Sequence, residues 1–92
     1  MRFHVQVLVS LRPGLLDPQG KAVEGALPAM GWTNVSDVRV GRYVRLDVDA
    51  ADEPAARDLV DALSERLLSN PVIETYRILE ITPDGEPDGR RS

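Results

Sequence analysis

Few side chains in this 92-residue sequence could carry out acid–base or nucleophilic chemistry. His4 is the single histidine, and the absence of cysteine excludes thiolate nucleophiles, thiolate metal sites and disulfides. A catalytic histidine needs a nucleophile or an orienting carboxylate close by, and the sequence neighbours of His4 supply neither. We therefore predict a surface histidine on a half-covered sheet, with catalysis as the weaker alternative.

Carboxylates crowd one short region that contains Asp47, Asp49, Asp52 and Glu53. A divalent cation needs several oxygen ligands, but this spacing matches no calcium loop, and the helix dipole alone favours acids at a helix start. The glycines form no phosphate-binding pattern, and the only lysine, Lys21, falls in the exposed first turn of a predicted helix. The sequence thus predicts no catalytic residue, no bound cofactor and no metal site.

The most suggestive motif is an arginine-rich run at residues 39–45. It contains three arginines and one tyrosine: Arg39, Arg42, Tyr43 and Arg45. These residue types are enriched at protein–protein hot spots, so an interface and a solvated hairpin are both open interpretations. An RNA-binding surface is disfavoured, because 11 basic against 15 acidic residues give a net charge of −4 and only 4% of the residues are aromatic.

Hydropathy patterning gives the elements that would position these residues. Alternating apolar residues predict strands at 3–11, 35–40, 44–49 and 75–82, with a hairpin loop at residues 41–43. Apolar stripes at helical spacing predict two helices, which begin at the caps Asp17 and Asp52 and end at Gly31 and Asn70. Pro28 is expected to bend or fray the end of the first helix.

The order β-α-β-β-α-β predicts an α+β fold, an antiparallel sheet with two helices on one face. Residues 1–82 would form this single domain, and residues 83–92 a disordered tail. Leu8, Leu79 and Ile81 lie beyond the reach of two short helices, which favours dimerisation through the sheet or by strand exchange. No apolar run is long enough for a membrane span, so a cytoplasmic location is expected.

The predicted hairpin contains a conflict of charges. If Val40 pairs with Val44, Arg39 falls opposite Arg45, and Asp37 falls opposite Asp47 in the same way. Like charges directly opposite each other destabilise a strand pair. Either a bulge at the hairpin shifts the register, or another chain supplies the opposite charges.

Three segments resemble the PurS family, the small subunits of phosphoribosylformylglycinamidine (FGAM) synthase. They are RPGLLDPQGKAVEGAL (residues 12–27), VSDVRVGRY (35–43) and LSNPVIETY (68–76). The resemblance covers residues 3–81. It implies a non-catalytic subunit of an ATP-dependent amidoligase complex in purine biosynthesis, a homodimer or higher oligomer that shows no activity alone.

In that family, a glutaminase subunit releases ammonia and a large ATP-dependent synthetase adds it to formylglycinamide ribonucleotide (FGAR) to give FGAM. The resemblance implies that this chain bridges the two subunits and assists ammonia transfer, while ATP and magnesium belong to the synthetase. An amino-acid-sensing regulatory domain of the ACT type is the alternative, because it shares the order of elements and the lack of catalytic groups.

Two segments are the predicted contacts with the larger subunits. The arginine-rich run has no obvious charge partners within the chain, and the loop of residues 12–20 is stiff and exposed ahead of a helix. The predicted contact residues are Arg12, Pro13, Asp17, Pro18, Gln19, Arg39, Gly41, Arg42, Tyr43 and Arg45. No nucleic acid or membrane is expected among the partners.

Overall fold

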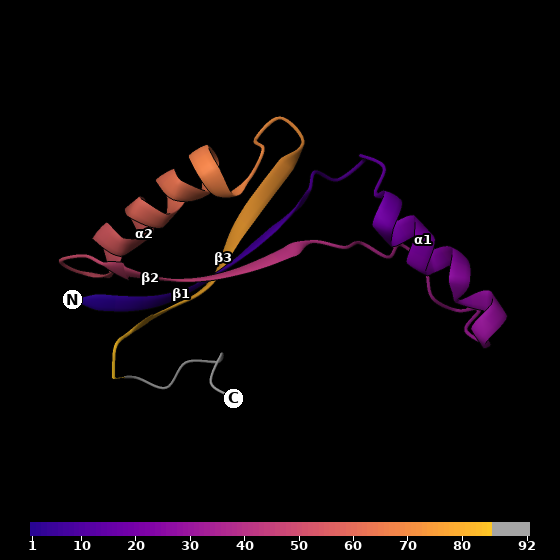
Figure 1. Ribbon diagram of the computed structural model, residues 1–92, viewed down its shortest axis with the longest axis horizontal. Helices are drawn as coiled ribbons and strands as arrows, with labels where there is room; N and C mark the ends of the chain where they lie inside the picture. Colours follow the sequence, from indigo (N-terminus) through magenta and orange to yellow (C-terminus); the bar gives the residue numbers. More distant parts are fainter. Residues whose placement is uncertain (86–92) are drawn as a thin grey trace.

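A three-stranded antiparallel sheet is the centre of the fold in the computed structural model, which describes residues 1–85 (Figure 1). Its strands are β1 (Arg2–Leu11), β2 (Arg42–Asp49) and β3 (Glu74–Pro83), in the order β2-β1-β3. This confirms the predicted α+β class with an antiparallel sheet. The predicted tail overlaps the described residues only at 83–85, where Pro83 ends β3, and residues 86–92 lie outside them.

The core lies on one face of β1, as the alternation of its residues predicted. Phe3, Val5, Val7 and Val9 are each at most 2% exposed. Val48 of β2 and two residues of the second helix complete the buried cluster. Apolar burial of this kind stabilises the fold by about 25 cal/mol per Å².

A bulge changes which side chains of β3 face the core. The pairing of β1 with β3 shifts between Gln6 and Val7, so that Gln6 pairs with Glu80 while Val7 pairs with Ile78, and Leu79 is the extra residue. Ile81 therefore packs against the core with Tyr76 and Ile78, so the expectation that it lies beyond the reach of the helices is wrong. Leu79 remains 42% exposed.

Helix α2 (Glu53–Leu63) covers the core face of the sheet and continues into the π-helical turn η2 (Ser64–Leu68). Asp52 caps it as predicted, because its side chain accepts a hydrogen bond from the Ala55 N–H at 2.9 Å. Ala56 and Val60 are fully buried against the sheet. Over residues 1–85, no helix combines the length and the apolar character that crossing a membrane requires.

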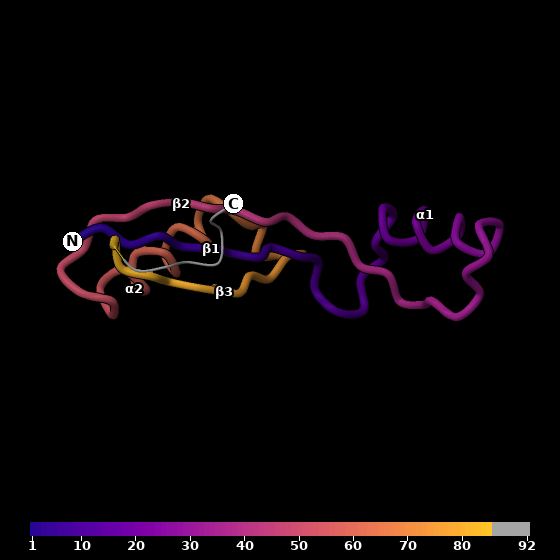
Figure 2. Tube along the Cα trace, turned by 90° about the horizontal axis from the view of Figure 1, so that it is seen from below, coloured from indigo at the N-terminus to yellow at the C-terminus, as the bar shows by residue number. Residues whose placement is uncertain are grey.

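Helix α1 (Pro18–Ala26) and the 3₁₀ turn η1 (Pro28–Met30) lie beyond the end of the sheet (Figures 1 and 2). The bend at Pro28 and the left-handed Gly31, with φ of 99°, are as predicted. The prediction of two helices on one face holds only for α2, since α1 makes no substantial contact with the described strands. The radius of gyration is 16.5 Å, whereas a compact chain of this length would have about 12 Å.

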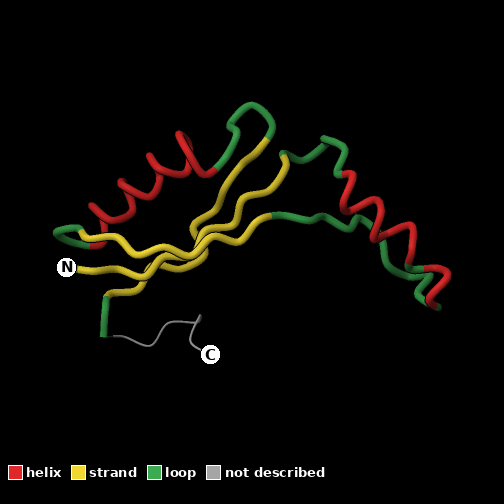
Figure 3. Tube along the Cα trace, in the orientation of Figure 1, coloured by secondary structure: helices red, strands yellow, loops and turns green. Residues whose placement is uncertain are grey.

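The strand predicted at residues 35–40 is not formed within this chain. This segment, which we call the strap, runs as an extended loop between η1 and β2 (Figure 3). The hairpin loop is also wrong, because Arg42 and Tyr43 belong to β2. Pairing β2 with β1 instead avoids the charge conflict, since Gln6 lies opposite Arg45 and His4 opposite Asp47.

Candidate partner interface

The two predicted contact segments meet where α1 and the strap join the sheet. Asp17 is only 3% exposed, and its two carboxylate oxygens accept hydrogen bonds from backbone N–H groups on different elements. The Gly20 N–H of α1 lies 2.9 Å from Oδ1, and the Val40 N–H of the strap lies 2.8 Å from Oδ2. One side chain thus caps the helix and fastens the strap to it. We refer to α1, η1 and the strap together as the arm.

The same two hydrogen bonds set the charge state of Asp17. The hydrogen bond from Gly20 and then the one from Val40 lower the pKa of the carboxyl, and they outweigh the opposing effect of burial. The nearby guanidinium of Arg39 acts in the same direction. Asp17 is therefore ionised, and it joins α1 to the strap. This structural role explains an aspartate at the start of the helix without any contact to a partner.

Two glycines near Asp17, Gly20 and Gly41, allow another backbone segment to approach closely. A Cβ at Gly20 would lie 2.1 Å from the Val38 carbonyl oxygen, and a Cβ at Gly41 would lie 2.7 Å from that of Val9. Both distances are far below van der Waals contact, so only glycine fits at either position without a shift of the backbone. The strap also donates the Val38 N–H to Glu24 of α1 at 3.1 Å.

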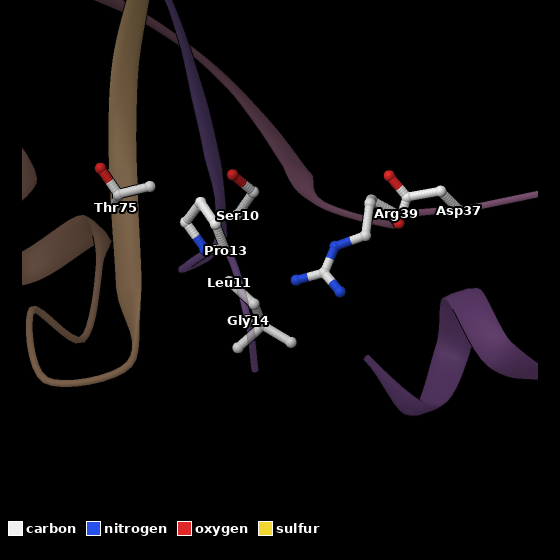
Figure 4. A pocket seen from close by; sticks show the side chains of 7 residues that line it. All are labelled: Ser10, Leu11, Pro13, Gly14, Asp37, Arg39 and Thr75. Atoms are coloured by element: carbon white, nitrogen blue, oxygen red, sulfur yellow. The ribbon is translucent and has the colours of Figure 1, made fainter. Parts of the chain in front are cut away.

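Arg39 joins the strap to the loop that follows β1. Its two terminal nitrogens donate to the carbonyl oxygens of Leu15, at 3.0 Å, and Arg12, at 3.4 Å. The side chain extends beside a hollow of about 380 Å³ (Figure 4). The hollow is lined by Ser10, Leu11, Pro13, Gly14, Asp37, Arg39 and Thr75.

Arg12 contacts a different loop, residues 69–73, which we call the tip loop, and Arg42 contacts the two residues that flank it. Arg12 donates to the Pro71 carbonyl oxygen from Nε at 3.1 Å and from a terminal nitrogen at 2.6 Å. Arg42 donates to Leu68 O at 2.7 Å and to the Glu74 carboxylate at 3.1 Å. The Asn70 N–H, and after it Arg42, lower the pKa of Glu74. The expectation that Arg42 lacks a charge partner is therefore wrong.

The other predicted contact residues are more exposed and less constrained. Tyr43 is 51% exposed on β2, and Arg45 is an exposed neighbour on the same strand. Pro13, Pro18 and Gln19 are exposed where the arm begins. The structure thus brings residues 12–19 together with residues 39–42, while Tyr43 and Arg45 extend from this junction along the sheet. Whether any of them contacts a partner stays a prediction.

His4 has carboxylate partners that its sequence neighbours did not reveal. Nδ1 lies 2.8 Å from Asp47 and Nε2 lies 2.8 Å from Asp84. The pairing of β1 with β2 places Asp47 opposite His4, and the end of β3 brings in Asp84. These two contacts of His4 join β1 to β2 and to the residue that follows β3.

A second polar contact joins β3 to helix α2. The Tyr76 hydroxyl donates to Asp61 at 3.0 Å, and burial together with this hydrogen bond raises its pKa to about 12. Tyr76 is therefore a neutral donor near pH 7. Within residues 1–85, no three acidic or histidine side chains are grouped so that they could hold a metal ion.

Fold and site together define a small α+β domain in which charged side chains hold surface loops in place. A family profile described as PurS, phosphoribosylformylglycinamidine (FGAM) synthase, matches residues 4–81. The chain belongs to the PurS family.

Relatives and solved structures agree with this assignment. The PurS subunits of FGAM synthase from Synechocystis and Bacillus subtilis are 44% and 46% identical to this chain. The matches cover 87% and 82% of this chain and 79% and 88% of those proteins. Thermus thermophilus PurS is similar in structure, with a TM-score of 0.78 and 36% identity over 90% of this chain and 98% of that one. A chain in a structure of PurLQS from Thermotoga maritima has a TM-score of 0.78 and 31% identity over 85% and 95%.

Proposed function

We propose that this chain is the non-catalytic small subunit of FGAM synthase and bridges the glutaminase subunit and the ATP-dependent synthetase. Membership in the PurS family supports its place in this enzyme of purine biosynthesis. The similarity to a chain of the Thermotoga PurLQS structure supports a role inside a larger assembly. In this role the chain assists the transfer of ammonia during conversion of FGAR to FGAM.

The bridging role is supported chiefly by the hydrogen bonds that join the arm to the sheet. Asp17, Arg39 and Arg42 each join segments that are more than 20 residues apart, and each does so through hydrogen bonds to backbone groups. These bonds hold surface loops in one conformation without forming a ligand cage around them. Binding a protein partner to loops that are already ordered loses less conformational entropy.

The absence of cysteine supports a non-catalytic role. His4 supports it as well, because carboxylates of Asp47 and Asp84 occupy both of its ring nitrogens and leave neither for a substrate. We therefore assign ATP and magnesium to the synthetase subunit and no cofactor to this chain. We also place the complex in the cytoplasm.

Self-association belongs to the same proposal. Val23 and Met30 of the arm and the adjoining Trp32 are 46%, 64% and 51% exposed, although they are large apolar residues. Leaving such surface in water costs about 25 cal/mol per Å². We propose that a second copy covers it, through the sheet or by exchange of the extended strap. The chain would then be a dimer or a higher oligomer.

Reconstituted synthesis of FGAM tests this function. The two larger subunits are assayed with and without this chain, once with glutamine and once with ammonia as the nitrogen donor. We expect that glutamine-dependent synthesis requires this chain and that ammonia-dependent synthesis by the synthetase does not. Equal glutamine-dependent rates with and without the chain would contradict the proposal.

A further inference from the structure

The hollow beside Arg39 contains two opposite charges that are not paired with each other. Asp37 and Arg39 of the strap both line this hollow of about 380 Å³, and both side chains are exposed to solvent. Within residues 1–85, the Asp37 carboxylate forms no ion pair and accepts no hydrogen bond. In the same part of the chain, the Arg39 guanidinium donates only to carbonyl oxygens. A carboxylate and a guanidinium are therefore both accessible to a ligand at one place.

Arg39 is held in position before any ligand binds. Its two terminal nitrogens donate to the carbonyl oxygens of Leu15 and Arg12, at 3.0 and 3.4 Å. A guanidinium carries more N–H groups than these two hydrogen bonds use, so others remain for a further acceptor. Figure 4 shows the side chain extending from the strap toward Leu11 and Gly14. A cation that is already fixed loses less conformational entropy when an anion binds to it.

The backbone conformation of Asp37 does not explain why this residue is an acid. Its φ is 56°, and among residues 1–85 it is the single residue other than glycine with a positive φ. Asparagine and glycine fit this left-handed conformation as well as aspartate does, so the turn itself needs no carboxylate. Residues held in such conformations cluster at binding sites. The negative charge of Asp37 is therefore assigned to a ligand and not to the fold.

We propose that this hollow binds a free α-amino acid. The Asp37 carboxylate accepts hydrogen bonds from the α-ammonium group, and the Arg39 guanidinium donates to the α-carboxylate. Asp37 and Arg39 line one hollow without pairing with each other, and an α-amino acid carries the two complementary charges on a single carbon atom. A simple anion or cation would satisfy only one of the two side chains. This inference goes beyond the bridging role and does not depend on it.

The wall formed by the sheet favours a ligand with a polar side chain. Ser10 of β1 and Thr75 of β3 lie opposite each other in the strand pairing, and both line the hollow. Neither hydroxyl forms a hydrogen bond with another residue that the structure describes. A hydroxyl both donates and accepts, so the two together suit the C=O and N–H groups of an amide. We therefore expect an amino acid with a side-chain amide to bind more tightly than an aliphatic one.

Binding is measured from the backbone amide chemical shifts of the full chain, with L-glutamine as the probe. The hollow is open and the ligand is small, so we expect a dissociation constant of about 1 mM. The amides of residues 37–40 should shift and reach saturation. L-Leucine has a side chain of similar size without an amide, and it should bind at least about 3-fold more weakly.

Asp37→Asn removes the charge and keeps a residue that suits the left-handed conformation. We expect it to weaken binding of L-glutamine by about 10-fold, as loss of a charge-assisted hydrogen bond does. Asp58→Asn is the matched control, because Asp58 is an exposed acid on α2, and it should change binding less than about 2-fold. N-Acetyl-L-glutamine lacks the α-ammonium group. It should bind the wild type about 10-fold more weakly than L-glutamine, and Asp37→Asn should bind both ligands alike.

Thermal unfolding separates binding from a structural role of the carboxylate. The midpoint of Asp37→Asn should be no lower than that of the wild type, because no contact within residues 1–85 uses the carboxylate. If the variant has a lower midpoint and binds L-glutamine as the wild type does, the carboxylate stabilises the strap and the inference is wrong. It is also wrong if the wild type shows no saturable shift at about 10 mM L-glutamine. Reconstituted synthesis of FGAM tests the proposed function separately, so neither result would overturn it.

Discussion

The two helices of this chain begin with similar residues but lie in different surroundings. Each has an aspartate cap with proline as one of its first residues, and each has an apolar stripe in its sequence. Helix α2 buries Ala56 and Val60 completely against the sheet, whereas Gly20 is the only buried residue of α1. Helix α2 thus completes the core of its own chain.

The arm is held in place without the burial of apolar side chains that fixes α2. The arm is ordered by polar groups, because Asp17 and Glu24 accept hydrogen bonds from the strap and Arg39 donates to the adjoining loop. Its apolar side chains remain exposed, Val23 among them. An apolar stripe with no sheet of its own chain beneath it supports the proposed self-association.

The largest effect is expected from a charge placed in the core under α2. Val60 is fully buried, so Val60→Asp should lower the free energy of unfolding by roughly 3–5 kcal/mol through an unpaired buried charge. Val23→Asp on α1 should leave the secondary structure intact and reduce self-association. Thermal unfolding and sedimentation measure the two outcomes. If both variants lost similar free energy of unfolding at low protein concentration, both helices would contribute to the core of their own chain, and the comparison would fail.

A smaller effect is expected where the strap crosses α1. Gly20→Ala places a methyl group 2.1 Å from the Val38 carbonyl oxygen, which should cost roughly 1–3 kcal/mol within the arm. Gly25→Ala is the matched control, because nothing lies within 4 Å of its added Cβ and the helix should gain up to about 1 kcal/mol. Hydrogen exchange at the Val38 and Val40 amides reports the difference. Unchanged protection of these amides in Gly20→Ala would contradict the close contact between the strap and α1.

The smallest effect concerns acid sensitivity of the arm. The pKa of Asp17 lies below its ordinary value of 3.8 in the folded chain, so its contribution is present above that pH and is lost as the pH falls through the lowered pKa. After correction for intrinsic exchange, the Val40 amide of the wild type should lose protection at acid pH. Asp17→Asn should show weaker protection without this acid step. An identical acid step in the variant would assign it to another group.

Local signals in the sequence predicted the elements that depend on neighbouring residues. The alternation in β1, the caps Asp17 and Asp52, and the left-handed Gly31 all follow from spacing and residue type, and the structure confirms them. The α+β class follows from the order of these elements. The bulge at Leu79 could not be placed, because it is defined by the register between two strands that are far apart in the sequence.

The candidate site was predicted less well for the same reason. The residue types in segments 12–20 and 39–45 indicated an interface, but strand preference alone placed a hairpin at Gly41. The partners of Arg12 and Arg42 lie 59 and up to 32 residues away, so spacing along the chain does not reveal them. His4 and Asp47 are likewise joined only by the pairing of β1 with β2. Like charges facing each other in the supposed hairpin were the one signal against it.

Bridging is tested most directly by sedimentation of the two larger subunits, alone and with this chain added in excess. The account predicts that glutaminase and synthetase sediment separately without this chain and as one complex that contains all three proteins when it is present. Association of the two larger subunits at the same affinity in its absence would contradict the central claim that this chain joins them.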